Sequence, residues 1–558
     1  MHAPFISQSN RRHALAVLCV LIVGLAAYAN TWSAPFQMDE GLYLRDNPFV
    51  REGGGSVDVV RTDPELYKSV VQRYVAYLTF ALNYRIHGLH VIGYHVVNVA
   101  IHLLNALLVY VFVLVTFRTP MLRSSVLTSA SWYPAFFTAL FFVAHPVQTE
   151  AVTYIMQRLT SLAAFFSLVS IVLYGAGRLA EEEPIVRTGR SRWSGPRWWY
   201  AGAVLFAVLA MKTKENAFIL PMLIALYEAF FFTGEVKKRV VRLLPILATM
   251  LIIPLTTYLL LREQGVHLAG MAAGGGGNEI PWWSYLITQS RVLVTYVRLL
   301  VVPFGQNFYY DYPVYQSLLE PAVLLSLTLH ACIVSLGIIL FRSATRVDPA
   351  LRVVSFGILW FYVALSVESS IIPLPRVICE YRMYLPSVGF ILAVISGVFI
   401  LFAKTGLGKG LRAGLVALSV LLVGTAYAAY NRNDVWRDTV SLWEDTAGKS
   451  PENSEVHTNL GAAFVRWGRY PEAMGELQTA LQLASRSKRQ ITFLHIIHTH
   501  LGTAYSELGR SEDAIREFQI ALKLSPQDVY AAKNLALEYA RLGRFEEAGK
   551  LSPEFLTK

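Results

Sequence analysis

Two adjacent carboxylates, Asp39 and Glu40, follow directly after the first long apolar run of the chain. A carboxylate whose pKa is tuned by its surroundings can take a proton from an attacking hydroxyl group. Basic side chains stand in comparable places further on, because Arg158, Lys214 and Arg382 each lie at one end of an apolar run. Arg and Lys suit a phosphate group, and Arg can contact it with two parallel hydrogen bonds. These residues therefore suit base chemistry on a hydroxyl beside a bound phosphate.

Six more polar residues are candidates for the same pocket: Arg73, His95, His145, Glu150, Glu215 and Glu380. Ionisable side chains within a membrane usually mark a functional site. A structural salt bridge is the simpler interpretation of any one of them, but many at one depth favour a shared polar pocket. His95 also begins a stripe with Asn98, His102 and Asn105, spaced three, four and three along one helix face. Hydrogen bonds between helices are the alternative interpretation of that stripe.

The elements that must position these residues are membrane helices. The chain has 558 residues, of which 54% are hydrophobic and 16% charged, whereas a soluble domain carries about 25% charged residues. Many apolar runs reach the length of about 20 residues that spans a bilayer. The net charge of +11 comes from basic residues between these runs, which argues against a nucleic-acid partner. The three cysteines support neither a disulfide framework nor a zinc site.

Cytoplasmic loops collect Lys and Arg, and six connections here are basic. Placing all six inside predicts eleven spans, at residues 13–31, 92–117, 132–147, 153–177, 198–213, 216–233, 243–261, 320–341, 352–369, 384–403 and 411–430. The first run is interpreted as an uncleaved span. The N-terminus is then cytoplasmic and the tail external. The external segments are 32–91, 145–152, 262–319 and 370–383, of which the first and third are long.

Residues 285–303 form one more apolar run, but Arg291 and Arg298 lie seven apart on one face of it. A charge at mid-membrane costs about 2.5–3.5 kcal/mol even on a lenient insertion scale. We therefore expect an external helix that lies in the interface or re-enters the membrane. A twelfth span, with its arginines facing the bundle interior, is the alternative.

The tail repeats itself. Gly509 and Gly543 are 34 residues apart, and so are Ala514 and Ala548. A 34-residue period with small residues at these positions predicts tetratricopeptide repeats, each a pair of helices. We therefore expect a membrane domain at 1–430, a linker at 431–450 and three repeats at 451–558. Such a solenoid usually holds a protein or peptide in its groove, and a purely structural cap is the alternative.

Together these features fit a sugar donor linked to a lipid phosphate and a hydroxyl acceptor. Direct displacement, helped by Asp39 as base, would invert the anomeric centre, as in an inverting hydrolase. The cations Arg158, Lys214 and Arg382 would stabilise the negative charge of the leaving phosphate.

Four segments carry a family resemblance: "FQMDEGLYLRDNPFV", "RYVAYLTFALNYRIHGLHVIGYHVVNVAIHLLNALLVY", "FFVAHPVQTEAVTYIMQRLTSLAAFFSLVSIVLY" and "IIPLPRVICEYRMYLPSVGF". With "MKTKENAF" and the repeat tail, they resemble the transmembrane and tetratricopeptide repeat-containing O-mannosyltransferases, members of the GT-C glycosyltransferase superfamily. The resemblance implies an all-α GT-C membrane domain and Asp39 as catalytic base, with Glu40 where a second Asp is common. It also implies a polyprenyl-phosphate sugar donor and Ser or Thr acceptors on exported proteins, docked by the repeats. Arg382 is assigned to the donor phosphate.

The chain departs from the family pattern in places. Val75 stands where Pro is expected, Gln148 replaces a His, and Tyr381 replaces the His of an "EHR" motif. These departures leave the donor and acceptor open. A divalent metal is possible beside the acidic pair, but carboxylates alone do not indicate one.

Short loops and a short repeat tail favour a bacterial inner membrane with periplasmic repeats. Two other classes of protein compete with the enzyme. A non-catalytic repeat scaffold for envelope or pilus assembly would not need the acidic pair. A ligase or polymerase of lipid-linked glycans would need a larger external cavity, while a transporter would favour internal duplication, which the sequence does not show.

Overall fold

In the computed structural model, the described residues are 8–38, 40–182, 196–263, 280–404, 409–486 and 494–551. They form helices, turns and loops, with no strand among them, so the predicted all-α fold is confirmed. The chain divides into two compact units. Unit 1 holds Met1–Gln306 and Val314–Asp434, and unit 2 holds Asn307–Pro313 and Val435–Lys558.

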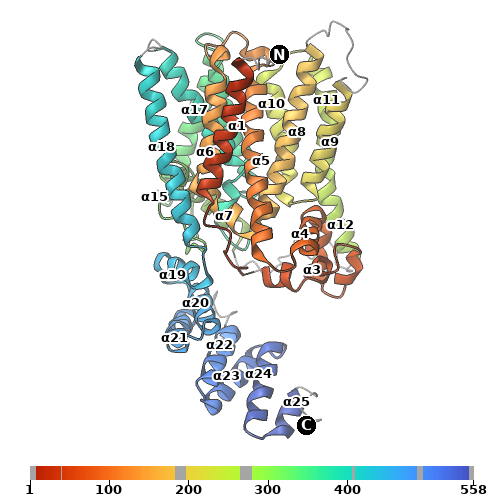
Figure 1. Ribbon diagram of the computed structural model, residues 1–558, viewed down its shortest axis with the longest axis vertical. Helices are drawn as coiled ribbons and strands as arrows, with labels where there is room; N and C mark the ends of the chain where they lie inside the picture. Colours follow the sequence, from red (N-terminus) through yellow and green to blue (C-terminus); the bar gives the residue numbers. More distant parts are fainter. Residues whose placement is uncertain are drawn as a thin grey trace, which may run out of the picture. The chain divides into compact units, whose positions relative to one another are not determined.

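Unit 1 is a bundle of long apolar helices that run side by side (Figure 1). They are α1 (Gln8–Ala27), α5 (Val91–Phe117), α6 (Trp132–Ala144), α8 (Arg158–Glu182), α9 (Pro196–Met211), α10 (Leu220–Phe231), α11 (Val236–Ala248), α12 (Ile252–Glu263), α15 (Pro321–Ser343), α16 (Leu351–Leu365), α17 (Pro386–Lys404) and α18 (Lys409–Asp434). Apolar side chains from both ends of this sequence range form one buried core, because each helix buries one face against its neighbours.

Length and composition allow seven of the described helices to cross a membrane, or eight if the bent pair Trp132–Ala144 and Pro146–Thr153 is one span. These correspond to eight of the eleven predicted spans. The other three predicted spans are the shorter helices α9, α10 and α16, which lie in the same bundle. The short helices end where polar segments begin, and those segments build the site described below.

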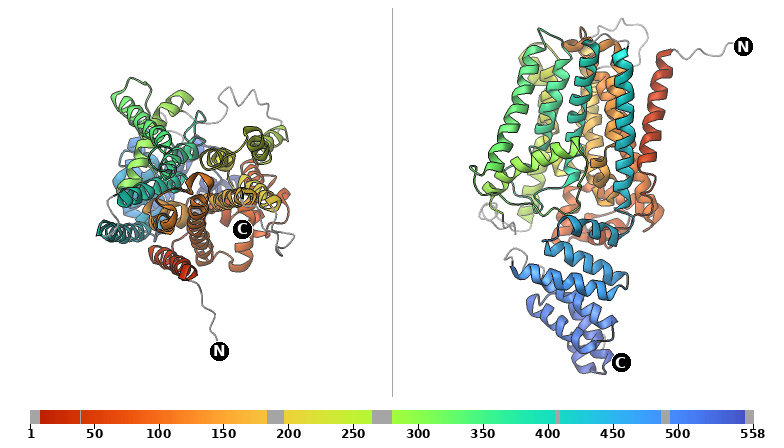
Figure 2. Two further views of the ribbon diagram at one scale, coloured as in Figure 1. Left: turned by 90° about the horizontal axis from the view of Figure 1, so that it is seen from above. Right: turned by 90° about the vertical axis from the view of Figure 1, so that its left-hand side faces the viewer.

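The helices place the predicted external segments at one end of unit 1. Helices α3 (Pro64–Gln72) and α4 (Tyr74–His87) of the first long segment lie beside the end of α12, whereas α11 begins at the opposite end (Figure 1). Helix α14 (Trp282–Val301), the run with two arginines, lies across the bundle helices (Figure 2). Its Tyr285 and Tyr296 hydroxyls donate to the backbone oxygens of Glu368 and Cys379 (2.8 and 2.9 Å). It is not among the helices that length and composition allow to span.

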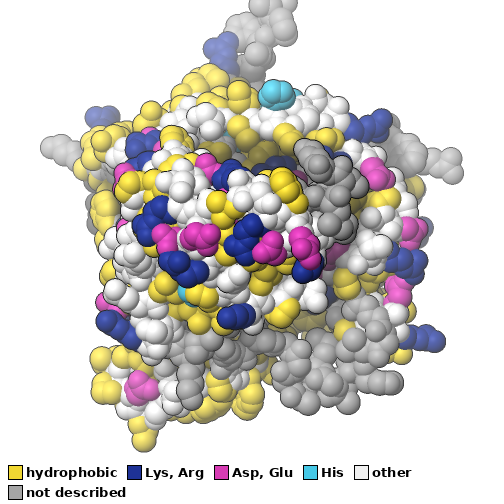
Figure 3. Space-filling view, turned by 90° about the horizontal axis from the view of Figure 1, so that it is seen from below, with side chains coloured by type: hydrophobic (Ala, Val, Ile, Leu, Met, Phe, Trp, Pro, Cys, Tyr) yellow, Lys and Arg dark blue, Asp and Glu magenta, His cyan; other side chains and the backbone are white. Residues whose placement is uncertain are grey.

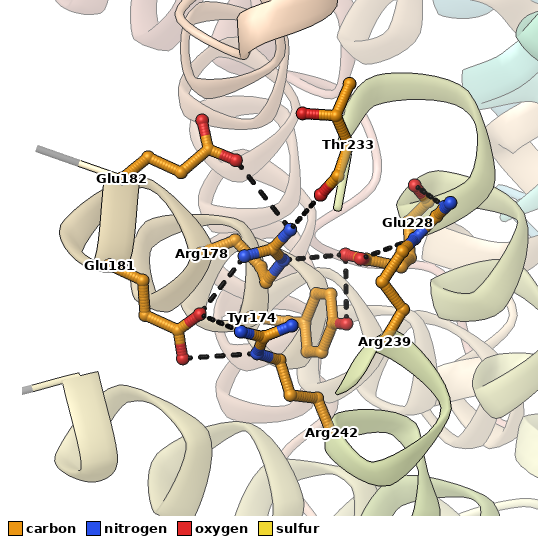
Figure 4. Close-up of polar contacts among 8 residues, drawn as sticks. All are labelled: Tyr174, Arg178, Glu181, Glu182, Glu228, Thr233, Arg239 and Arg242. Atoms are coloured by element: carbon orange, nitrogen blue, oxygen red, sulfur yellow. Dashed lines mark hydrogen bonds and ion pairs between the residues drawn. The ribbon is translucent and has the colours of Figure 1, made fainter. Parts of the chain in front are cut away.

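An ion network joins α8, α10 and α11 (Figure 4), at the end of unit 1 opposite to α3 and α4 (Figure 1). The buried carboxylate of Glu228 accepts from Arg178 Nε (2.9 Å) and from Arg239 Nε (3.1 Å). Glu181 accepts from Arg178 and contacts Arg242 at 2.9 Å. Since acids and bases pair here and the buried charges are compensated, we assign this network to helix packing.

Small residues bring α16 and α17 together. A Cβ atom on Gly357 would lie 2.3 Å from the Gly389 carbonyl oxygen, so only glycine allows this approach. Close backbone contact through small residues is a common way to join membrane helices. The contact fixes the start of α17, and with it the turn η9 (Glu380–Met383).

The polar stripe of α5 joins helices. His95 Nε2 bonds the Ala34 carbonyl (2.8 Å), Asn98 donates to the Val152 carbonyl (3.1 Å) and Asn105 donates to the Ser161 carbonyl (2.8 Å). His102 bonds the Tyr384 hydroxyl and the Val143 carbonyl (2.7 and 3.1 Å). The structure therefore supports the interpretation in which the stripe makes hydrogen bonds between helices and segments.

Unit 2 is a series of helices with a segment of seven residues, Asn307–Pro313, packed against it. The Phe308 ring lies 5.0 Å from the ring of Trp436 and 5.5 Å from that of Trp443. The helices are α19 (Thr439–Lys449), α20 (Ser454–Arg466), α21 (Tyr470–Arg486), α22 (Leu494–Glu507), α23 (Ser511–Leu524), α24 (Val529–Arg541) and α25 (Phe545–Leu551). The predicted linker, 431–450, is therefore mostly helical, since it contains the end of α18 and the whole of α19.

The small residues of the repeats act as their period predicts. A Cβ atom on Gly502 would lie 2.6 Å from Phe518, so glycine lets α22 and α23 pack closely. Gly509 and Gly543 have φ of 73° and 74°, a left-handed conformation that ends a helix and favours glycine. Acidic and basic side chains intersperse on the face seen in Figure 3. Surfaces of mixed sign suit a soluble region.

Candidate functional site

A cavity of about 570 Å³ lies within unit 1, among the segments predicted to be external. Its described charged lining residues are Arg73, Lys214, Glu215, Glu368, Arg376 and Arg382. They come from three stretches of the chain, at residue 73, at 214–215 and at 368–382, which the fold brings together. Four are cationic and two acidic, so the lining carries a net charge of +2 when all six are ionised. A net positive lining attracts anions.

Lys214 follows α9 and precedes the turn η7 (Glu215–Ile219). Its Nζ donates to Thr160 Oγ1 (2.6 Å) and Gln157 Oε1 (3.3 Å), and lies 4.2 Å from the centre of the Tyr381 ring. All three partners are neutral. Burial lowers the pKa of Lys214 to about 8, although the Glu368 carboxylate opposes the shift. The ammonium charge is therefore held in place without being neutralised by a direct ion pair.

Arg73 and Glu215 form an ion pair on the cavity wall. Arg73 stands at the break between α3 and α4, and its Nε lies 2.9 Å from Glu215 Oε1. Burial alone would raise the pKa of Glu215, but the Arg73 guanidinium outweighs it and lowers the pKa. The pair ties the first external segment to η7, so we assign both residues to building the wall.

The turn η9 brings Arg382 to the cavity. Arg382 Nη1 donates to the Val377 carbonyl (3.1 Å) and Nη2 to the Arg376 carbonyl (2.8 Å). The turn itself is held from behind, because the Tyr381 backbone N–H donates to Glu150 Oε2 (2.9 Å). Glu380 accepts from the Gln306 amide (2.7 Å). Glu150 and Glu380 thus lie behind the residues that line the cavity.

Asp39 lies outside the described residues, but both of its neighbours are described. Glu40 is fully buried, and its carboxylate accepts from the backbone N–H groups of Gln37 (2.5 Å) and Met156 (2.7 Å). Met38 has φ of 41°, which is rare for a residue with a side chain. Its sulfur accepts from Arg376 Nη2 (3.3 Å). Strained backbone of this kind gathers at functional sites.

Arg158 does not line the cavity. It is fully buried, and its guanidinium donates to the Asn98 and Asn83 side-chain oxygens, each at 2.7 Å. It also lies over the Phe80 ring, 4.4 Å from its centre. His145 likewise contacts backbone, since Nε2 bonds the Leu300 carbonyl (3.1 Å). Together with His95, these residues support the segments around the cavity.

Two charged cavity residues, Glu368 and Arg376, were not among the residues predicted from the sequence. The same signal marks both, namely an ionisable residue at the external end of an apolar run. Glu368 was instead included in the predicted span 352–369. Among the described residues, no group of three His, Cys, Asp or Glu side chains could hold a metal ion.

The described chain is thus an α-helical membrane protein with a cationic cavity and a helical-repeat tail. The family model "Tetratricopeptide repeat" matches residues 500–551. The chain is 23% identical to protein O-mannosyl-transferase Tmtc3 of Drosophila melanogaster, over 86% of this chain and 56% of that protein. It is also 23% identical to protein O-mannosyl-transferase F38B6.6 of Caenorhabditis elegans, over 85% of this chain and 64% of that protein. The predicted resemblance to this family is confirmed.

The chain spans only about 56–64% of the length of these two relatives. Among solved structures, ArnT from Cupriavidus metallidurans bound to undecaprenyl phosphate is 15% identical, over 97% of this chain and 88% of that chain. Its TM-score of 0.40 is too low to establish a common fold.

Proposed function

We propose that this protein is a membrane-embedded inverting glycosyltransferase of GT-C type. It moves a sugar from a polyprenyl-phosphate donor to Ser or Thr hydroxyls of exported proteins. The observation that supports this most is the cationic cavity of unit 1, with Lys214 and Arg382 on its wall. The names of the relatives, protein O-mannosyl-transferases, agree with a hydroxyl acceptor on a protein.

The charge of the cavity suits the leaving group. A donor phosphodiester carries one negative charge, and the phosphate gains a second as its bond to the sugar breaks. The net charge of +2 on the described lining therefore stabilises the product-like transition state more than the donor. Stabilisation that grows toward the transition state is what accelerates the chemical step. Lys214, Arg376 and Arg382 would hold the phosphate.

Asp39 is the proposed base. In a direct displacement, the acceptor hydroxyl oxygen attacks the anomeric carbon, and the electrons of the breaking bond pass to the phosphate oxygen. The hydroxyl proton passes to the Asp39 carboxylate. Support comes from the sequence position of Asp39 between Met38 and Glu40, whose contacts, Arg376 and Met156, both line the cavity. Glu40 would position this segment, since both of its oxygens accept backbone N–H groups.

The tetratricopeptide repeats of unit 2 would dock the acceptor protein, as such solenoids commonly bind peptides. The basic connections between the bundle helices suit a cytoplasmic face, which would leave the cavity on the external face. We further propose a bacterial inner membrane as the setting, with the N-terminus in the cytoplasm and the repeats in the periplasm.

The test is sugar transfer by the purified full chain in liposomes. The donor is polyprenyl-phosphate mannose, and the acceptor is a Ser/Thr-rich secreted protein analysed by intact mass. Asp39→Asn should lower the transfer rate about 10²- to 10⁴-fold, the range that a general base usually contributes. Lys214→Ala should also abolish measurable transfer.

Lys212→Ala is the matched control. Lys212 lies two residues before Lys214, but its Nζ donates to Thr256 Oγ1 (2.9 Å) and it does not line the cavity. Its variant should transfer sugar at the native rate. An acceptor that keeps its mass with the native protein, or gains hexose equally with Asp39→Asn, would refute the assignment.

A further inference from the structure

Glu368 is an acid in a cavity that otherwise favours anions. It follows α16, is 8% exposed and lines the cavity. Its backbone carbonyl accepts from the Tyr285 hydroxyl, but within the described chain its carboxylate makes no hydrogen bond or ion pair. The other described acid on the wall, Glu215, is paired with Arg73. Glu368 is therefore an unpartnered buried carboxylate that faces the cavity.

A mostly buried carboxylate without a hydrogen-bond donor in the protein is costly to keep charged, and Glu368 lines the cavity, where a ligand can donate to it. Burial raises the pKa of Glu368, and the charges of Lys214 and Arg382 oppose the shift. The Glu215 carboxylate also acts on Glu368 through charge and raises its pKa further. An acid in that position also repels a phosphate. Its presence is explained if the complete ligand brings hydrogen-bond donors to it.

We propose that Glu368 accepts hydrogen bonds from hydroxyl groups of the sugar attached to the donor phosphate, and so selects that sugar. This inference rests on the proposed function. A carboxylate offers two oxygens, and neighbouring sugar hydroxyls can each donate to one of them. Because Lys214 and Arg382 would hold the phosphate, the group bonded to that phosphate is the one that reaches an acid close to both. Glu368 would thereby distinguish the donor that carries a sugar from the sugar-free product, polyprenyl phosphate.

The experiment measures binding of two lipids to the full chain in nanodiscs, polyprenyl-phosphate mannose and sugar-free polyprenyl phosphate. Glu368→Gln should raise the Kd of the mannose lipid about tenfold, the effect of losing hydrogen bonds to a charged group. The same variant should lower the Kd of the sugar-free lipid about threefold, because a like charge leaves the cavity. The two changes have opposite signs, which damage to the fold does not produce.

Glu215→Gln is the contrasting variant on the same wall. It removes the same charge and frees Arg73 from its ion pair without removing the proposed contact to the sugar, so it should change both Kd values in the same direction and by a similar factor. If Glu368→Gln also changes both equally, Glu368 has a structural role and the proposal is overturned. If the native chain binds neither lipid, the proposed function itself fails, which is a separate outcome.

A second measurement uses the native chain and so does not depend on the stability of a variant. Donor lipids in which single mannose hydroxyls are replaced by hydrogen should bind more weakly, about tenfold for at least one of them. That loss should be absent in Glu368→Gln where the variant folds. Equal binding of every deoxy donor to the native chain would overturn the proposal.

Discussion

Lys214 should make donor binding depend on pH, and Lys214→Arg should remove that dependence. Only the ammonium form attracts a phosphate, and burial lowers the pKa of Lys214 to about 8. At pH 7 about nine tenths of the side chain is protonated, but at pH 9 only about one tenth is. The apparent affinity scales with the competent fraction, so the Kd should rise about tenfold from pH 7 to pH 9.

The sign of this effect follows from linkage. A bound phosphate favours the charged lysine, so binding takes up a proton wherever the free side chain has lost it. Binding therefore weakens as pH rises through the pKa of the free form. A guanidinium stays charged throughout this range, so the Arg variant should bind with a constant Kd between pH 7 and pH 9.

The assay is equilibrium binding of polyprenyl-phosphate mannose to the full chain in nanodiscs at pH 7, 8 and 9. The other groups that act on Lys214 by charge are Glu368, Arg73, Glu215 and Arg382. The two arginines stay protonated, and the lowered pKa of Glu215 keeps it ionised, so they add little pH dependence here. Lys212→Ala should retain the native profile. A native Kd that is constant from pH 7 to pH 9, or an Arg variant that keeps the tenfold change, would refute the role of Lys214.

Three further predictions concern other parts of the molecule. Arg382→Ala should raise the Kd of the donor lipid about tenfold or more, the cost of losing charge-assisted hydrogen bonds, while acceptor binding changes little; equal loss of both would remove its phosphate role. Gly389→Ala should destabilise the bundle by about 1–3 kcal/mol, because its Cβ would lie 2.4 Å from a Trp ring of α16. Gly397 has open space around it, so Gly397→Ala should unfold in detergent at or above the native unfolding temperature. The Glu476 carboxylate accepts a hydrogen bond from His457 Nδ1 and so raises the pKa of His457. The pair should therefore stabilise unit 2 below pH 6.5 and lose this effect as pH rises; Glu476→Gln should flatten that pH dependence in chemical unfolding of the full chain, and an unchanged slope would contradict it.

Much of the architecture follows from the sequence because the bilayer restricts the choices. Apolar length and the distribution of Lys and Arg were enough to predict the bundle helices and the end at which the polar segments gather. The two arginines of α14 were enough to question a twelfth span. Helices α10 and α16 are shorter than expected, because polar turns replace their external ends and form part of the cavity wall. Hydropathy averages over such turns and so places them inside the spans.

The candidate site could be predicted only in part. The rule that ionisable residues at external helix ends converge found Arg73, Lys214, Glu215 and Arg382, and the structure brings all four to one cavity. The same rule also selected Arg158, which instead bonds the side-chain oxygens of α4 and α5. A buried arginine that binds a ligand and one that joins helices have the same signature in sequence. They differ only in whether the neighbouring segments leave a cavity in front of them.

The partners of the cations show that their charges remain available to an anion. Lys214 is held by a hydroxyl, an amide oxygen and an aromatic ring, and Arg382 donates to two backbone carbonyls. Neutral partners fix the direction of a charge without cancelling it, whereas a carboxylate partner would do both, as Glu215 does for Arg73. Charges fixed in this way act on a ligand without the cost of reorganising solvent. The same reasoning applies to Glu368. Its carboxylate lies near these cations but has no hydrogen-bond donor in the described chain, so in our proposal the ligand supplies that donor.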